Sequence, residues 1–292
     1  MILLSGANGV VGQPLCARLL AEGIDFSIVS RLSADSPNNR IHWDLKNLAS
    51  LAIAQQLAGH DTLIHCAPIW LLPMHLDALH RAGIRRMIVF SSTSVISKKT
   101  SANVQEQELV EQLASAEQRL CDYCQSNSIS LTILRPSLIY GYALDQNITR
   151  IAAFIQRFGF AVLVGQADGL RQPVHAEDLV EAVLAIKDRS ISFGKTYNLA
   201  GGESLSYTNM VKRIFKALNK NPRIIPLPLV VVRLALKVAA VLSPFGYTAE
   251  MADRMNQDLV FDYSAATADF NYRPQTFLVN PKRDLPLGKS KA

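Results

Sequence analysis

The sequence has few charged residues, and it lacks a stripe of one charge sign. Only 18% of its 292 residues are charged and 49% are hydrophobic, which excludes long disordered stretches and supplies a sizeable core. Residues 282–292 hold a net three of the six excess positive charges. A nucleic-acid partner is therefore not expected. The length allows one large α/β unit or two domains that share a core.

Cysteine is also scarce, and its four positions predict no redox or metal role. Cys16 and Cys66 fall inside apparent core elements. Cys121 and Cys124 have redox-motif spacing, but they lie within one long helical run and no strand delivers them to a helix N-terminus. The histidines show no metal-ligand spacing, so no metal is expected. The first strand begins at residue 2, which leaves no room for a signal peptide, and a cytoplasmic location is expected.

The strongest signal lies in the first dozen residues, where an apolar run is followed by glycines at three-residue spacing. A helical pattern follows at 14–23, so the stretch predicts a strand, a tight turn and a helix N-terminus, the arrangement that binds a pyrophosphate. The glycines permit the turn, close approach to phosphates and close packing of helix on strand. An ordinary strand-to-helix loop is the alternative. The predicted cofactor contacts here are Gly6, Asn8, Gly9, Val10, Val11 and Gly12.

Strands and helices alternate along the N-terminal half. Strands are predicted from residue 2 and at 24–29, 41–43, 61–66, 86–90 and 129–134, with helices at 14–23, 48–58, 74–82 and 104–125. Because parallel strands need crossovers and helices are the usual ones, this alternation predicts an α/β fold with a parallel sheet covered on both faces.

The end of the second predicted strand indicates which dinucleotide fits. An acidic residue there would accept hydrogen bonds from the adenosine ribose, whereas an arginine would attract a 2′-phosphate. This chain has Ser30 and Arg31 at that position. We therefore expect NADP(H) rather than NAD(H), although an exposed loop arginine is the simpler interpretation. Asp44, after the third strand, is then placed to bind the adenine edge.

Six short segments, spread over most of the chain, carry recognisable motifs in a fixed order: 6–12, 65–67, 91–93, 134–141, 173–179 and 197–202. They resemble the successive signatures of the extended short-chain dehydrogenase/reductase family, the nucleotide-sugar epimerases and dehydratases. The resemblance implies a Rossmann-type doubly wound parallel sheet and a smaller, mostly helical C-terminal domain that binds substrate. It implies an NADP-binding domain at 1–145 and 173–200, a substrate or lid domain at 146–172 and 201–280, and a flexible tail at 281–292.

The resemblance also implies roles for individual residues. Further cofactor contacts are expected at Leu45, Cys66, Ala67, Ser91 and Pro136. Ser92 takes the position that holds a substrate oxygen, and Thr93 is expected beside the substrate. Arg171 stands where sugar-nucleotide members hold a diphosphate, a task that suits a guanidinium, but arginines before a strand are often surface charges.

The chemistry of this family uses a tyrosine with a lysine four residues on, which lowers the pKa of the tyrosine. None of the eight tyrosines has a lysine at that spacing. Counting back from the helix segment at 116–120 puts the two positions at Val110 and Ala114, both apolar. The usual proton relay is therefore in doubt. The substitutes available from the sequence are Tyr140, Lys98, Lys99 and His175, each with a structural alternative.

Two functional hypotheses remain open. The chain is an NADP-dependent oxidoreductase or epimerase acting on a nucleotide-sugar-like small molecule, or it is a catalytically degenerate protein that binds NADP(H) as a sensing or structural ligand. Residues 228–242 are apolar with two cations four apart, which predicts a lid helix over the substrate or an interfacial helix at a membrane. The oligomeric state stays open, and a homodimer is compatible with the sequence.

Overall fold

The computed structural model describes residues 1–31, 40–47, 51–228, 232 and 253–286. Its contacts divide the chain into two compact units. The first comprises Met1–Ser137, Ala176–Leu199 and Asp262–Arg273, and the second comprises Leu138–His175, Ala200–Phe261 and Pro274–Ala292.

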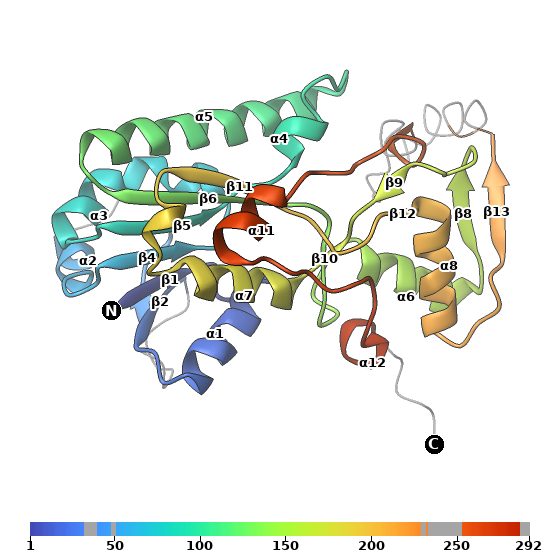
Figure 1. Ribbon diagram of the computed structural model, residues 1–292, viewed down its shortest axis with the longest axis horizontal. Helices are drawn as coiled ribbons and strands as arrows, with labels where there is room; N and C mark the ends of the chain where they lie inside the picture. The colour runs from blue at the N-terminus through green and yellow to red at the C-terminus, as the bar shows by residue number, and fades with distance from the viewer. Residues whose placement is uncertain (32–39, 48–50, 229–231, 233–252, 287–292) are drawn as a thin grey trace. The chain divides into compact units, whose positions relative to one another are not determined.

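A seven-stranded parallel sheet forms the centre of the first unit (Figure 1). Its strands are β1 (Ile2–Ser5), β2 (Phe26–Ser30), β3 (Arg40–His42), β4 (Thr62–His65), β5 (Arg86–Phe90), β6 (Ser130–Pro136) and β11 (Lys195–Leu199). They lie in the order β3-β2-β1-β4-β5-β6-β11, and all neighbours are parallel. This confirms the predicted doubly wound sheet, whose direction of winding reverses between β1 and β4. Ligands bind such sheets outside the carboxyl ends of the strands at that reversal.

Helices cover both faces of this sheet, as the alternation of elements predicted (Figure 1). The helices of the first unit are α1 (Gly12–Ala21), α2 (Leu51–Gln56), α3 (Leu76–Ala82), α4 (Ser94–Ser97), α5 (Val104–Ser126), α7 (Ala176–Ile186) and α11 (Ser264–Phe270), with 3-10 turns η1 (Ile69–Leu71), η2 (Pro73–His75) and η3 (Ser190–Ser192). One face carries α2, α3 and α5, and the other carries α1 and α7. The sequence placed α11 with the second domain, but it packs on β11 and α7.

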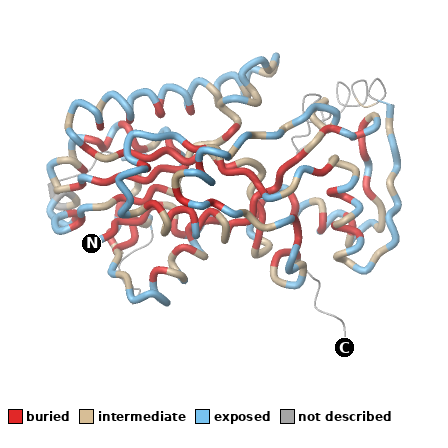
Figure 2. Tube along the Cα trace, in the orientation of Figure 1, coloured by how far each residue is buried: buried red, intermediate tan, exposed pale blue. Residues whose placement is uncertain are grey.

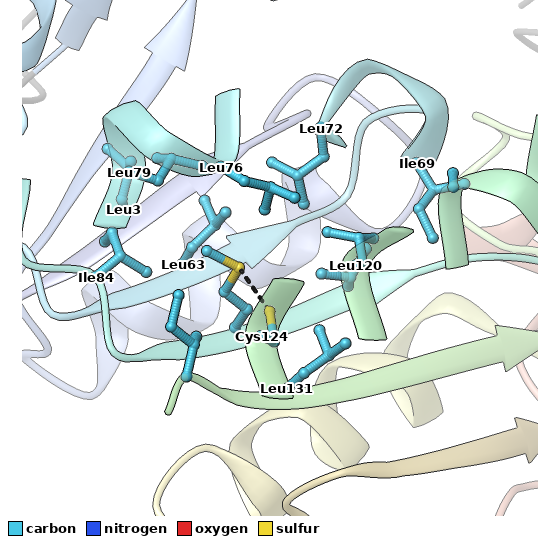
Figure 3. Packing of buried hydrophobic residues seen from close by; sticks show 14 of the residues in the cluster. Leu3, Leu63, Ile69, Leu72, Leu76, Leu79, Ile84, Leu120, Cys124 and Leu131 are labelled. Atoms are coloured by element: carbon cyan, nitrogen blue, oxygen red, sulfur yellow. Dashed lines mark hydrogen bonds between the residues drawn. The ribbon is translucent and has the colours of Figure 1, made fainter. Parts of the chain in front are cut away.

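The core on the α3 and α5 side is rich in leucines, which come from strands and helices together (Figure 3). Leu3 and Leu63 from the sheet lie against Leu79 from α3 and Leu120 from α5, and each is at most 2% exposed. Burying such a side chain stabilises a fold by about 1.5–3 kcal/mol. Cys124 belongs to this core, with its Sγ 3.9 Å from the Met87 Sδ, and all four cysteines are free.

The second unit combines helices with three two-stranded sheets. Its described helices are α6 (Ile148–Phe158), α8 (Tyr207–Ala217) and α12 (Pro281–Asp284), and its strands are β7 (Ile139–Tyr140), β8 (Ala161–Val164), β9 (Leu170–Arg171), β10 (Val174–His175), β12 (Leu205–Ser206) and β13 (Ile224–Leu227). The pairs are β7 with β10, β9 with β12, and β8 with β13. These strands were not predicted, because they do not alternate with helices as the strands of the first unit do. Figure 2 marks the exposed stretches of β13.

The C-terminal segment differs from the flexible tail predicted from residue 281. Residues 281–284 form α12, where Asp284 is 1% exposed and accepts a hydrogen bond at 3.0 Å from the Nε2 of His175. This buried pair and the buried Leu285 hold the segment within the second unit. Residues 287–292 lie outside the described residues, as does the predicted lid or interfacial helix at 228–242 except for residues 228 and 232. No helix within the described ranges is long and apolar enough to cross a membrane.

Candidate functional site

The glycine turn after β1 is packed so closely that side chains cannot replace two of its glycines. Gly6 has a φ of +77°, and a Cβ built on it would lie 2.5 Å from the Ala67 nitrogen. A Cβ on Gly12 would lie 2.1 Å from the Gly6 oxygen. Both obstacles are backbone atoms, which cannot rotate away. The turn therefore brings the start of α1 directly onto the carboxyl ends of β1 and β4.

The tip of this turn is open to solvent. Asn8 and Gly9 are exposed, and the Gly9 amide donates to the Gly6 carbonyl at 3.0 Å. Val11 precedes α1 as its N-cap residue and its side chain makes no capping hydrogen bond, while Val10 is half-buried. An N-terminus of this kind presents backbone N–H groups and the positive end of a helix dipole, and these groups suit a phosphate.

A buried histidine supports the turn from below. The Nδ1 of His65, the last residue of β4, lies 2.7 Å from the Ser5 Oγ, and its Nε2 lies 3.2 Å from the Pro68 carbonyl oxygen. A neutral ring satisfies both partners, because a proton on Nε2 is donated to the carbonyl and the hydroxyl can then donate to Nδ1. Burial lowers the pKa of His65 from its ordinary 6.5 to about 4. His65 is fully buried, so it is part of the core at this edge of the sheet.

Two residues that follow β4 complete the rim of the turn. The Cys66 amide donates to the Ser5 carbonyl at 2.9 Å, which continues the β1–β4 pairing by one residue. Ala67 contributes the amide nitrogen that approaches Gly6. Burial raises the pKa of the Cys66 thiol, so this thiol stays protonated and acts as a small apolar group.

The carboxyl ends of β2 and β3 carry the residues predicted for the adenosine half. Ser30 is half-buried as the last residue of β2, and Arg31 directly after it is exposed. Asp44 is half-buried and its Oδ1 accepts a hydrogen bond from the Lys46 amide at 3.1 Å, so one carboxylate oxygen shapes the local turn. The Leu45 carbonyl accepts a hydrogen bond from the Nε2 of His75 at 2.9 Å.

The polar run after β5 is largely occupied by local hydrogen bonds. The Ser92 Oγ accepts from the Ser94 amide at 3.1 Å and lies 3.0 Å from the Ser94 Oγ, which ties it to the first residue of α4. Thr93 is buried, and both its amide and its Oγ1 donate to the Pro136 carbonyl at 3.1 Å. Ser92 remains half-buried. Its hydroxyl hydrogen is donated to the Ser94 hydroxyl, so it can be turned toward a ligand without breaking a backbone contact.

A carboxylate that no sequence motif indicated contacts this run through Ser91. Glu117, on α5, accepts a hydrogen bond from the Ser91 Oγ at 2.5 Å and from the Arg135 Nε at 2.9 Å, and it forms an ion pair with the Arg135 Nη2. The hydrogen bond to Glu117 raises the pKa of Arg135 further. A glutamate on the inward face of a long helix, with an arginine at the end of a neighbouring strand, was the available signal. The network fixes α5 against the ends of β5 and β6.

The residues of α5 that face the core are not the predicted pair Val110 and Ala114 but their preceding neighbours, Leu109 and Leu113. Ala114 is exposed and Val110 is half-buried, whereas Leu113 is buried and Leu109 packs on the core. Leu109 and Leu113 are four residues apart, so they are neighbours on one helix face. Both registers carry apolar side chains. Over residues 109–114 the helix therefore offers neither a phenol nor an amine.

Tyr140 and Arg171, in the second unit, are held by backbone groups. Tyr140 is fully buried, and its hydroxyl oxygen accepts a hydrogen bond from the Leu278 amide at 3.0 Å. The guanidinium of Arg171 is 5% exposed and donates to the carbonyls of Leu170 and Gln257, each at 2.7 Å, and of Arg254. These contacts give both residues structural work within their unit. Their predicted roles toward a substrate stay predictions.

Of the other candidate proton donors, Lys98 and His175 are also engaged. The Lys98 Nζ forms an ion pair at 3.2 Å with the Glu106 carboxylate, and Lys99 is exposed. His175 is fully buried against Asp284, as its interpretation as a hydrogen-bonded bracket predicted. Within the first unit, the structure thus brings together the glycine turn, the ends of β2 to β6 and Ser92.

Comparison with known proteins agrees with this geometry. The sequence pattern described as the NAD dependent epimerase/dehydratase family matches residues 2–70 and 75–200. An uncharacterised UDP-glucose epimerase of Bacillus subtilis is 26% identical over 254 residues, which cover 73% of this chain and 80% of that protein. A UDP-glucose 4-epimerase of Vibrio cholerae is 23% identical over 306 residues, which cover 94% of this chain and 90% of that protein.

A solved structure shows that the similarity extends to the fold. It is a UDP-glucuronic acid 4-epimerase from Bacillus cereus, in complex with UDP-glucuronic acid and NAD. It superposes with a TM-score of 0.73 at 18% identity, over 97% of this chain and 96% of that one. The family pattern covers most of the sequence, and the structure contains a Rossmann-type sheet. The chain therefore belongs to the NAD dependent epimerase/dehydratase family.

Proposed function

We propose that this protein binds a nicotinamide dinucleotide along the carboxyl ends of β1, β2 and β4, with its pyrophosphate on the amides that open α1. The observation that carries the proposal is the backbone packing of the glycine turn. Gly6 and Gly12 leave no space for a Cβ, while Asn8 and Gly9 between them are exposed. A turn that served only to connect a strand to a helix would not need backbone contacts this close.

We further propose that the preferred dinucleotide is NADP(H). Arg31 is exposed directly after β2, and neither it nor Ser30 supplies a carboxylate to bind the ribose hydroxyls of NAD. A guanidinium in this position suits a 2′-phosphate, which it can contact with two donors. The solved relative from Bacillus cereus is in complex with NAD, so the choice between the two cofactors is the first matter to measure.

Titration of NADPH and NADH against the Arg31→Ala variant tests the cofactor. We expect NADPH to bind more tightly than NADH, and the variant to lose about tenfold in NADPH affinity with little change for NADH, because only NADPH carries the 2′-phosphate. Arg189→Ala, an exposed arginine elsewhere in the first unit, is the matched control and should bind as the parent does. Equal losses for both cofactors in Arg31→Ala would remove the 2′-phosphate argument.

The proposed substrate is a nucleotide sugar or a similar ligand, because both sequence relatives are named as UDP-glucose epimerases. A bound nicotinamide would supply hydride transfer. The contribution of this chain would be the Ser92 hydroxyl, which can hold a substrate oxygen, on a strand end that Glu117 and Arg135 keep in place.

A second function is favoured by the inward face of α5. Val110 and Ala114, the positions that the resemblance assigns to the tyrosine and lysine, are apolar, as are their inward neighbours Leu109 and Leu113. The Tyr140 hydroxyl is buried and accepts a hydrogen bond from a backbone amide. A protein that binds NADP(H) without turning it over, as a sensor or scaffold, would tolerate such residues. In that case the dinucleotide would act as a ligand and stabilise the folded chain.

Turnover measurements separate the two functions. NADPH oxidation is followed with a panel of 4-keto nucleotide sugars, and interconversion is followed with UDP-glucose and UDP-glucuronic acid. A rate in the parent that falls in Ser92→Ala supports the enzyme. Saturable NADPH binding with no oxidation and no interconversion supports the binding protein.

A further inference from the structure

The second unit carries a cluster of exposed phenylalanines that the proposed function does not use. Phe158 is 51% exposed and Phe154, one turn earlier on α6, is 37% exposed. Their rings lie 4.7 Å apart, and the Phe154 ring also meets that of Phe160 at 5.6 Å. Aromatic side chains of this size usually lie in cores. Two exposed rings packed with a third, half-buried ring therefore indicate a surface that contacts another apolar environment.

The cluster continues onto the β8–β13 sheet. Phe160 precedes β8, and because side chains alternate along a strand it lies on the same face as Val162. Val162 pairs with Ile225 of β13, and these two side chains are 37% and 45% exposed. Phe154, Phe158, Phe160, Val162 and Ile225 therefore form one contiguous apolar surface, here called the aromatic face. It contains only described residues.

Positive charges surround the aromatic face. Arg150 lies one helical turn before Phe154, and the guanidinium of Arg157 lies 5.2 Å from the centre of the Phe158 ring. Arg223 is two residues before Ile225, and its carbonyl accepts a hydrogen bond from the Ala161 amide at the start of β8. All three arginines are exposed, and none takes part in an ion pair within the described part of the chain.

The elements that build this face contain no acidic residue at all. Residues 146–167 contain two arginines, residues 207–227 contain five lysines and arginines, and neither stretch has an aspartate or a glutamate. The whole chain has 24 acidic residues against 30 basic ones, so this local imbalance is large. A surface that is apolar at its centre and cationic at its rim complements an anionic lipid bilayer, where phenylalanines enter the acyl boundary and arginines contact phosphates.

We propose that the aromatic face of the second unit binds the surface of an anionic membrane. Charge complementarity decides between the occupants. A second copy of this chain would place like charges from two cationic rims against each other, which opposes association. A bilayer that contains acidic lipids satisfies the rings and the arginines at once. The protein would then act on, or sense, ligands close to that surface while its first unit binds the dinucleotide.

Flotation with lipid vesicles tests the proposal on the full chain. We expect binding to phosphatidylcholine vesicles containing 30% phosphatidylglycerol, and at least tenfold weaker binding to phosphatidylcholine alone. The double variant Phe154→Ser/Phe158→Ser should lose binding at least tenfold. The triple variant Arg150→Gln/Arg157→Gln/Arg223→Gln should bind roughly a hundredfold more weakly. Salt should weaken binding of the parent, because screening reduces the attraction between exposed charges and the lipid headgroups.

Controls keep the outcome interpretable. Leu20→Ser/Ile191→Ser removes two similarly exposed apolar side chains from the first unit and should bind vesicles as the parent does. NADPH affinity and thermal unfolding, measured on every variant, show whether a loss of binding reflects a loss of folding. The proposal is overturned if the folded parent leaves anionic vesicles unbound, if the phenylalanine and control variants lose binding equally, or if the phenylalanine variant only converts a dimer to a monomer.

Discussion

The glycine turn after β1 and the inward face of α5 lie in the same unit, yet they depend on their sequences in opposite ways. The turn is fixed by what cannot be added, because backbone atoms fill the space beside Gly6 and Gly12. The face of α5 is built from side chains, with Leu113 in the core cluster and Leu109 packed against it. We therefore expect the turn, whose contacts are backbone atoms, to tolerate fewer substitutions than this helix face, where another apolar side chain can take the same place.

The largest expected effect comes from adding one methyl group to the turn. In Gly12→Ala the new Cβ meets the Gly6 oxygen and the Ala7 Cα, so the turn must open, and we expect a loss of about 3 kcal/mol in the free energy of unfolding. NADPH binding should be lost as well. In Gly9→Ala the nearest atom is 3.3 Å away, so a clearly smaller loss is expected. Urea unfolding and NADPH titration measure both variants, and equal stability of the two would break the comparison.

A second test asks whether the buried histidine supports the turn. His65 has a pKa of about 4 when folded and an ordinary value of 6.5 when unfolded. Between these values the unfolded chain binds more protons, so stability is complete above pH 6.5 and falls by up to about 3 kcal/mol as the pH drops toward 4. Urea unfolding from pH 7.5 to 4.5 should show this slope in the parent and in His42→Gln, an exposed histidine. The slope should be flatter in His65→Asn; an unchanged slope would mean that another group titrates.

The smallest of the three effects is expected on α5. Glu117→Gln removes the charge that pairs with Arg135 and weakens the acceptor of the Ser91 hydroxyl. Because the pair is buried on one side only, we expect a loss of about 2 kcal/mol, below that of a fully buried pair. Glu111→Gln, an exposed position on the same helix, should change stability by less than about 0.5 kcal/mol. Thermal unfolding of both variants gives the difference, and an equal response would show that the network contributes nothing specific.

The sequence predicted the sheet well because its apolar strands alternate along the chain with helices. Six of the seven parallel strands and the long helix α5 are found close to their predicted limits. The short strands of the second unit were missed, because a strand such as β9 consists of two residues held by their partners. Pro226 is a further example. A proline argues against a strand, yet Pro226 lies inside β13, because it is tolerated where its missing N–H is not needed for pairing.

The candidate site shows a similar division. Arg171 carries the right chemistry for a diphosphate, but its guanidinium is satisfied by carbonyls of residues 254–257, some eighty positions away. Glu117 looked like an ordinary residue of a long helix until the fold placed Ser91 and Arg135 beside it. Hydrogen-bond partners of this kind are set by the crossing of distant elements, and no local pattern records them.

The sequence by itself determined the order of the elements, the position of the glycine turn and the absence of a tyrosine and lysine at helical spacing. These properties depend on neighbours within a few residues, through the steric freedom of glycine and the periods of helix and strand. The tertiary structure alone decided which polar groups are free to meet a ligand and which exposed phenylalanines gather on one face. Burial and partnership arise only when segments far apart in the chain are packed together, because that packing removes water from some groups and leaves others open.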